Sequence, residues 1–361
     1  AKRSVRWVSA RISPMHRPVR GTMPTPICLP AISGTVFPTR NRALSLKSVC
    51  GRRCTTTLCK TYYVNPKIGD DGNDGLHEDR AFATLFAINR LNLQPGDSVL
   101  LMRDCIFEKQ FLQIRSSGTE CCPITIGTYG EGNDPLIAAD GQGIWYQDYG
   151  RELDSPTHVY HGYVSSAVLL YDAEYIIVRD LEITNCAEHI IGEKYSQGDK
   201  MERTGVAVVA KDKGMRRGIT LKNLKIHDVN GNVYDKHMNN GGIYMTALQP
   251  ENEAVTGVAR FGKILVEGCY VVNVSRWGIA VGYSYAHEQF QGAALKEDVF
   301  QKYGHLNIVI RDNYVKAAGG DGVTVMYALR PLVEHNTADS VACEMNDRVY
   351  REPGNRMGKV A

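Results

Sequence analysis

Five short segments with one shared pattern of apolar and polar residues recur between residues 176 and 335. The first position is Ile in four of them, the third is Val, Leu or Ile, and the fourth is always charged. The segments are 176–180, 219–223, 264–268, 308–312 and 331–335. Because side chains alternate between the two faces of a strand, the first and third positions are predicted to face a common core.

A second recurring pattern places Gly before a β-branched residue, at Gly205, Gly242, Gly278 and Gly322. A repeated Gly suggests a backbone path that a Cβ would obstruct. Glu267 precedes Gly278 by 11 residues, Arg311 precedes Gly322 by 11, and Gly322 precedes Glu334 by 12, so a bare turn spans 23 residues. This period predicts a stack of rungs, and a parallel β-helix fits better than a leucine-rich repeat, whose Leu and Asn ladder is missing. Longer turns carry insertions at about 188–203, 230–240, 249–262 and 283–304.

Several stretches also resemble a known family. The stretches YYVNPKIGDDGNDG, AFATLFAIN, LQPGDSVLL and PITIGTYGEGNDPLI look like an N-terminal cap, and VRDLEITN, LKNLKIHDVNGN and IRDNYVKAAGGDGVTV look like rungs. Over about 61–342 the chain resembles the right-handed parallel β-helix proteins of the pectate-lyase-like superfamily. The resemblance implies a carbohydrate-active protein with an extracellular or periplasmic location. The adjacent double Asp typical of the polygalacturonase hydrolases is not found at GGDGV.

We therefore predict an all-β protein, a right-handed single-stranded parallel β-helix (a solenoid) with an N-terminal cap that contains one short helix at 81–93. The predicted parts are a basic tail at 1–60, the cap and first strands at 61–140, the rungs with inserted loops at 141–343 and an irregular end at 344–361. The last part shows no capping element, so we expect a truncated stack.

Charge divides the chain unevenly. Residues 1–60 contain 12 Lys or Arg and no acidic residue, whereas the remainder contains 30 basic and 39 acidic residues, a net charge of −9. We interpret the tail as disordered or non-native; a transit peptide, a shifted reading frame and a basic anchor are alternatives. This distribution argues against a nucleic-acid partner. No run of about 18 apolar residues occurs, so no membrane-spanning helix is expected.

The loop at 69–75 is rich in Asp. Asp70, Asp71 and Asp74 offer the hard oxygen ligands that calcium prefers, although the loop does not match an EF-hand. A solvated turn is the alternative interpretation. Calcium is therefore the one cofactor that the sequence suggests.

Stacking predicts where a functional site forms, because equivalent residues of successive rungs lie about 4.8 Å apart. The turn before each Gly-containing strand should gather Arg203, Asn239, Asn240, Arg276 and Asp321 in one column. The insertion at 233–238 should project beside it. The candidate substrate-binding residues are Arg203, Glu188, His189, Asn240, Trp277, Tyr283 and Tyr327.

These residue types permit two reactions. A polysaccharide lyase needs a base for the C5 proton of a uronate, here Lys236 or His237, and a cation for its carboxylate, here Arg276 or Arg203.

A glycoside hydrolase needs two carboxylates, which Asp321 with Asp235 or Glu188 could supply. Cations outnumber acids in the column, so the sequence favours the lyase over the hydrolase. A noncatalytic glycan-binding solenoid is the third hypothesis. We expect a monomer that binds a polysaccharide or oligosaccharide.

Each candidate also has a purely structural interpretation. Asp321 could form a turn, and Arg203 and Arg276 could form a surface charge ladder. Lys236 and His237 could be solvated residues of a polar loop, and Trp277 could make a packing contact between rungs.

Overall fold

A computed structural model describes residues 59–342, except 155, 157, 188–200, 234 and 293–295. The tail predicted at 1–60 therefore lies almost wholly outside the described residues, and the end predicted at 344–361 lies entirely outside them.

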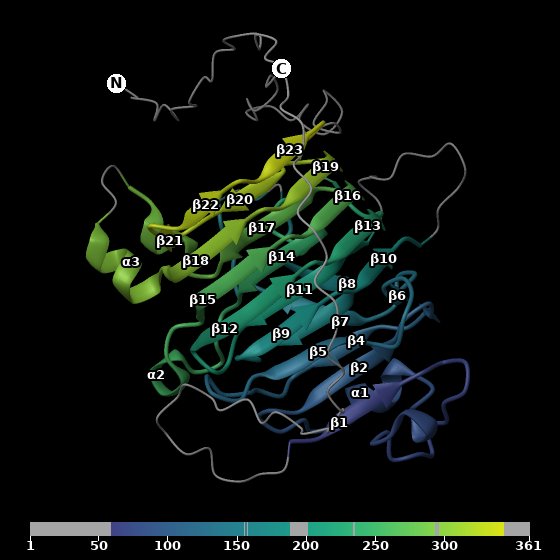
Figure 1. The fold of residues 1–361 in the computed structure, drawn as a ribbon. Coiled ribbons are helices and arrows are strands. Elements are labelled where there is room, and N and C mark those ends of the chain that lie inside the picture. Colours follow the sequence, from purple (N-terminus) through teal and green to yellow (C-terminus); the bar gives the residue numbers. More distant parts are fainter. Residues whose placement is uncertain are drawn as a thin grey trace, which may run out of the picture. The chain divides into compact units, whose positions relative to one another are not determined.

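Three parallel sheets wind through the described residues (Figure 1). Sheet A contains β1 (Thr61–Val64), β2 (Ser98–Met102), β5 (Ile124–Tyr129), β9 (Ile176–Arg179), β12 (Met215–Lys222), β15 (Arg260–Glu267), β18 (His305–Arg311), β21 (Ala328–Leu329) and β22 (Leu332–Glu334). Sheet B contains β3 (Ile106–Glu108), β6 (Leu136–Ala138), β10 (Glu182–Asn185), β13 (Lys225–Val229), β16 (Tyr270–Val274), β19 (Tyr314–Ala318) and β23 (Thr337–Asp339). Sheet C contains β4 (Leu112–Ile114), β8 (His161–Tyr171), β11 (Glu202–Ala210), β14 (Gly241–Ala247), β17 (Trp277–Ser284) and β20 (Val323–Val325).

The chain visits the three sheets in turn, which makes a right-handed parallel β-helix and confirms the predicted fold class. The one antiparallel pairing among the described strands joins β7 (Ile144–Asp148) to the start of β8. The described helices are short and lie in connections: η1 (Glu78–Arg80), α1 (Leu85–Asn89), α2 (Glu253–Thr256), η2 (His287–Phe290) and α3 (Glu297–Tyr303).

The predicted inward columns pair in register. Ile176, Ile219, Ile264 and Ile308 stack through sheet A and are at most 1% exposed. Their burial removes apolar surface from water, which stabilises the fold by roughly 25 cal/mol per Å² of buried apolar area. Val333 continues the third column but is 46% exposed, because β22 is the last described strand of sheet A.

The Gly column also behaves as predicted. A Cβ on Gly242 would lie 2.5 Å from the Gly278 carbonyl oxygen, and a Cβ on Gly278 would collide with the Gly322 carbonyl oxygen. Sheet C therefore turns so tightly at this column that only Gly fits.

The cap contains its one α-helix, but α1 is shorter than the predicted 81–93. Phe82 forms a parallel bridge with Val64, and its carbonyl oxygen accepts a bond from Asn65 N. These contacts draw residue 82 into the first rung, so the helix begins only at Leu85.

Candidate active site

Two buried carboxyl groups meet at the edge of sheet C where its strands start. Glu202 is the first residue of β11, and Asp235 lies in the insertion between β13 and β14; they are 8% and 7% exposed. Asn232 Nδ2 donates to Glu202 Oε1 at 3.3 Å and to Asp235 Oδ2 at 3.0 Å. One amide nitrogen thus holds the two oxygens less than about 6.5 Å apart.

The environment separates the pKa values of the two acids. Burial, with the neighbouring Asp235 charge, raises the pKa of Glu202 to about 8. Burial alone would also raise the pKa of Asp235, but contacts with His158, with Glu202 and with the Val159 N–H outweigh it and lower that pKa. At neutral pH the pair therefore holds one proton, which lies on Glu202. A pair of carboxyl groups that acts as general acid and general base needs this arrangement, with one group protonated and the other ionised.

A third carboxyl group, that of Asp154, lies in the connection between β7 and β8. Its Oδ1 lies 2.6 Å from His237 Nε2, and its Oδ2 accepts from Lys236 Nζ at 2.9 Å. Burial opposes ionisation of Asp154, but these two contacts dominate and lower its pKa. Burial lowers the pKa of His237, whose side chain is fully covered.

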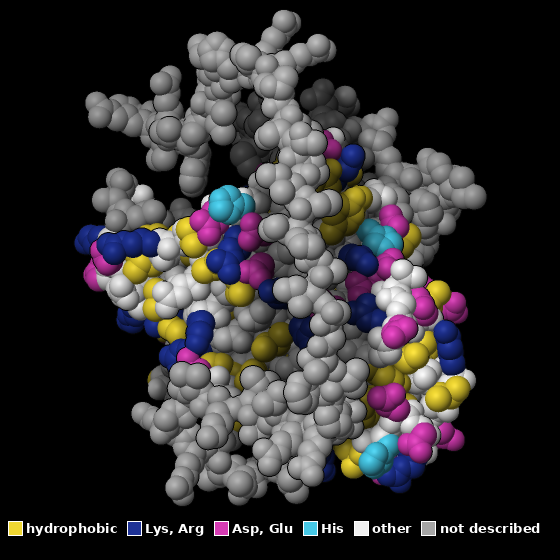
Figure 2. Space-filling model, viewed as in Figure 1, with side chains coloured by type: hydrophobic (Ala, Val, Ile, Leu, Met, Phe, Trp, Pro, Cys, Tyr) yellow, Lys and Arg dark blue, Asp and Glu magenta, His cyan; other side chains and the backbone are white. Residues whose placement is uncertain are grey.

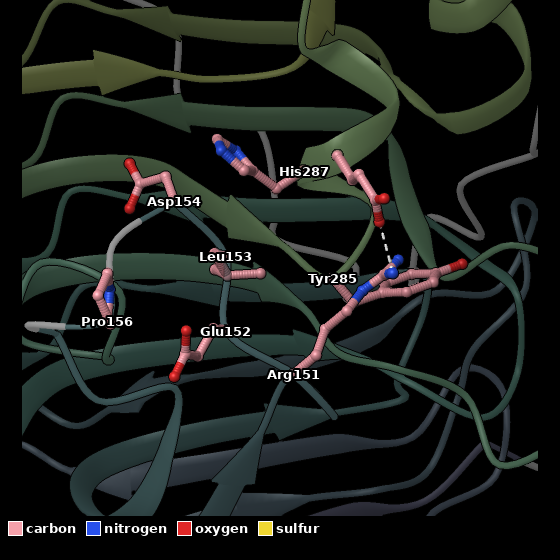
Figure 3. Close-up of a pocket in the computed structure, with 8 residues that line it drawn as sticks. Arg151, Glu152, Leu153, Asp154, Pro156, Tyr285 and His287 are labelled. Carbon is pink, nitrogen blue, oxygen red and sulfur yellow. Dashed lines mark ion pairs between the residues drawn. The ribbon is translucent and has the colours of Figure 1, made fainter.

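An open pocket of about 470 Å³ borders Asp154. Figure 3 shows its walls, which come from the β7–β8 connection and from the insertion after β17. Arg151 Nη1 and Glu288 Oε2 form an ion pair of 2.5 Å that joins these two walls. The lining residues are Arg151, Glu152, Leu153, Asp154, Pro156, Tyr285, His287 and Glu288. This mixture of charged groups and rings is suited to a polar ligand such as a sugar.

The arginines of the predicted column are buried instead of facing a ligand. Arg203, Asn240 and Arg276 occupy equivalent positions on successive rungs and are at most 3% exposed. Arg203 Nη1 donates to the Asn230 carbonyl oxygen at 3.1 Å, and Arg276 Nη1 donates to the Val233 carbonyl oxygen. The two guanidinium groups therefore hold the insertion that carries Asp235, so they are not the surface ladder considered above.

Asp235 meets a carboxyl group other than the predicted Asp321. Asp321 is exposed just before β20, the last described strand of sheet C, where its Oδ2 accepts from Thr324 Oγ1 at 3.4 Å. The carboxyl group that meets Asp235 belongs to Glu202. Glu188 and His189 lie outside the described residues.

The predicted aromatic residues pack more than they project. Trp277 is 5% exposed, and the Arg276 guanidinium lies 5.0 Å from its ring centroid. Tyr283 packs on His237, with centroids 4.5 Å apart, and Tyr327 Oη bonds to His287 Nδ1 at 2.6 Å. Tyr283 and Tyr327 thus contact the histidines beside the pocket.

The carboxylates of the Asp-rich loop make local contacts, within the loop and with residues 80–84 that follow it. Asp70 Oδ1 accepts from Gly72 N at 2.7 Å, and Asp71 Oδ1 accepts from Ala83 N at 2.9 Å. Asp74 pairs with Arg80 at 3.1 Å. Within the described part of the chain, no three His, Cys, Asp or Glu residues gather as a metal site would require. The calcium hypothesis therefore gains no support here.

Four residues of the site were missed by the sequence reasoning. Glu202 directly precedes Arg203, so its rung position could have revealed it. Asn232 lies in the insertion at 230–240, which was expected to reach the site. Asp154 and His158 lie between β7 and β8, where no repeated pattern marks them.

Charges of both signs lie on the described surface that Figure 2 shows. In the view of Figure 2, Lys and Arg side chains alternate with Asp and Glu and form no continuous basic band on the described surface. No helix among the described residues is both long and apolar enough to cross a membrane.

Comparison with known proteins shows that this chain is similar to lacto-N-biosidases. A GH136 lacto-N-biosidase from Eubacterium ramulus is 60% identical in sequence to this chain and aligns over 84% of it. Its crystal structures, of the native protein and of a selenomethionine derivative, each give a TM-score of 0.79. A lacto-N-biosidase from Bifidobacterium longum subsp. longum is 39% identical over 342 residues, 85% of this chain. This chain is a homologue of both. It spans 48% of the Eubacterium chain and 21% of the Bifidobacterium protein. No family model matches.

These relatives support the hydrolase alternative better than the lyase that the sequence favoured. Both are named for glycosidase activity. A rhamnogalacturonan lyase aligns with 13% identity and a TM-score of 0.36, a likeness too weak to support the lyase hypothesis.

Proposed function

We propose that this chain is the β-helix part of a glycoside hydrolase that acts on glycans carrying lacto-N-biose. The observation that carries the proposal is the Glu202–Asp235 pair, found in a chain 60% identical to a lacto-N-biosidase. A hydrolase requires two neighbouring carboxyl groups in opposite protonation states, and this pair supplies them.

The protonation states assign the roles. Glu202, which keeps its proton at neutral pH, donates it to the oxygen of the leaving sugar. Asp235, which is ionised, acts at the anomeric carbon from the other side of the bond. The two carboxyl groups contact each other, which leaves no room for a water between them and weighs against inversion, for which roughly 6.5–9.5 Å is typical.

The surroundings of the cations weigh against a lyase. Lys236 is engaged by Asp154, and the guanidinium groups of Arg203 and Arg276 hold backbone carbonyl oxygens. Lacto-N-biose is a neutral disaccharide, so it has no uronate carboxylate to neutralise and no acidified C5 proton to remove.

A direct assay tests the proposal. We expect the full chain to release lacto-N-biose from p-nitrophenyl β-lacto-N-bioside and from oligosaccharides that end in this disaccharide. Release of unsaturated uronate ends from acidic glycans instead would overturn the proposal. Binding of the oligosaccharides without release would favour the noncatalytic solenoid.

Single substitutions test the assignment. Glu202→Gln and Asp235→Asn should each remove most of the activity without loss of folding, judged by circular dichroism. Asp154 and Asp228, which border the insertion at 230–240, are replaced by Asn in parallel. If either of these variants lost more activity than Glu202→Gln, that residue would replace Glu202 as the catalytic partner of Asp235. Asp312→Asn, an exposed turn carboxylate on sheet A paired with His335, is the matched control.

Two expectations from the sequence stay predictions: an extracellular or periplasmic location, and a monomeric state. Size-exclusion chromatography with light scattering tests the second.

A further inference from the structure

We propose that Asp154 is a positioning residue that acts on the Glu202–Asp235 pair through two histidines, His237 and His158. Its consequence for catalysis rests on the proposed hydrolase function, whereas the coupling itself rests on the contacts. Through these contacts, a change at Asp154 in the open pocket would change the ionisation of the buried carboxyl pair.

The first link joins the pocket to His237. The Asp154 side chain is 26% exposed and lines the pocket, and its Oδ1 lies 2.6 Å from His237 Nε2. A carboxylate only accepts hydrogen bonds, so Nε2 carries the proton of this contact. The carboxylate thus fixes both the tautomer and the orientation of the ring.

The second link joins the two histidines. The His237 backbone is held in place, because its carbonyl oxygen accepts from Tyr149 Oη at 2.7 Å and from Gln147 Nε2 at 3.2 Å. The His237 ring meets the His158 ring edge-on, with centroids 5.3 Å apart and planes at 64°. Both rings are buried, so a rotation of one displaces the other.

The third link reaches the carboxyl pair. His158 Nδ1 lies 3.8 Å from Asp235 Oδ1, and Asn232 joins Asp235 to Glu202. Asp154 and His158 belong to one short connection, and Asp235 and His237 belong to one short turn. The two segments therefore touch at two points, which clamps the turn that carries Asp235.

Other charged groups around His237 set the direction of the effect. Lys236 Nζ pairs with Asp154 Oδ2 at 2.9 Å, and the Tyr283 ring packs on His237. The ring of His287, whose pKa is lowered by burial, lies 5.9 Å from the Tyr283 ring. Loss of the Asp154 carboxylate leaves the Lys236 ammonium unpaired beside the ring. The added positive potential disfavours a proton on His237 and favours ionisation of Glu202.

Titration of the histidines tests the coupling without any need for activity. In the full chain labelled with ¹⁵N-histidine, Asp154→Asn should lower the pKa of His237 and shift the ring resonances of His158. Glu152→Gln is the matched control, since it removes a carboxylate that lines the same pocket and leaves the Asp154–His237 contact intact. Unchanged His158 resonances in Asp154→Asn would overturn the proposal.

The pH dependence of kcat/KM tests the consequence for catalysis. The loss of activity at high pH follows the loss of the Glu202 proton, so Asp154→Asn should move that limb to lower pH by about 0.5 unit or more. Asp154→Glu should return it toward the original position. A lower rate with an unmoved limb would mean that Asp154 is merely structural, which overturns the positioning role. If the unmodified chain turns over no lacto-N-bioside, the proposed function fails, while the histidine titration still decides the coupling.

Discussion

Two glutamates of the stack, Glu267 and Glu202, have opposite chemistry. Glu267 lies on the outer face of sheet A between Lys222 and Arg311, whose contacts of 2.6 Å and 2.5 Å lower its pKa. Glu202 lies at the start of sheet C, where burial and the neighbouring Asp235 raise its pKa to about 8. The stack places both side chains at regular strand positions, so the difference comes from what covers them. A bare rung produces a stable ion pair, and an insertion folded over a rung produces an acid that keeps its proton.

The largest expected effect is on catalytic activity, where the two glutamates should differ most. Glu202→Gln should lower kcat/KM for lacto-N-bioside hydrolysis by about 10²- to 10⁴-fold, since a general acid contributes that much. Glu267→Gln should change it less than about twofold, because that carboxylate only holds cations on sheet A. Equal losses in the two variants would contradict the distinction between the two regions.

The next effect compares Gly residues of the two sheets. Gly278→Ala on sheet C should destabilise the protein by about 3 kcal/mol or more, because the new Cβ collides with a backbone carbonyl oxygen and with Val315. Gly262→Ala on sheet A should cost less than about 1 kcal/mol, because its first contact, at 2.9 Å, is the flexible end of Met215. Urea denaturation of both variants measures the difference. A similar loss of stability in Gly262→Ala would show that the backbone is not packed more tightly in sheet C than in sheet A.

The pH dependence of stability should have opposite signs for the two glutamates. An acid whose folded pKa is raised destabilises the fold progressively as the pH rises from its unfolded value, near 4.3, to about 8. Glu202→Gln should therefore raise Tm relative to the unmodified chain, by about 2–5 °C at pH 8, with little gain at pH 4.5.

Glu267 is the opposite case. Its lowered pKa contributes stability above the unfolded value, and this contribution is lost as the pH falls through the folded value. Glu267→Gln should therefore lower Tm at pH 7, and the melting temperatures of the variant and the unmodified chain should converge once the pH lies below the folded pKa of Glu267. Differential scanning calorimetry across this range checks both signs. Parallel curves for the two glutamates would contradict the assignment.

The smallest effect concerns the ion pairs of sheet A. Lys222 is 43% exposed, so Lys222→Met should cost only about 0.2–1 kcal/mol, and the cost should shrink in 1 M salt, where screening acts within about 3 Å. Chemical denaturation at low and high salt measures it. A cost that does not depend on salt would mean that Lys222 acts through packing.

Much of the stack could be predicted from the sequence, because its determinants are local. Alternation placed Ile219 and Ile264 inside, and the repeated Gly before a β-branched residue marked the tight wall at Gly242 and Gly278. Each rung repeats the conditions of the previous one, so a pattern in one strand predicts its neighbours.

The site was predicted only in part, because its members come from segments without a repeat. Asp235, Lys236 and His237 were expected in an insertion near the arginine column, and the structure places them there. Whether the arginines faced a ligand or held the insertion depended on burial, which the residue types did not reveal.

The sequence by itself determined the parallel stack, its inward columns and the insertion that carries Asp235. Tertiary structure alone brought Asp154 to His237 across 83 residues of chain, placed Glu202 against Asp235 and covered both acids. The physical reason is that alternation and stacking act between neighbours on a regular lattice, whereas a pKa depends on which distant groups exclude water from a carboxyl group.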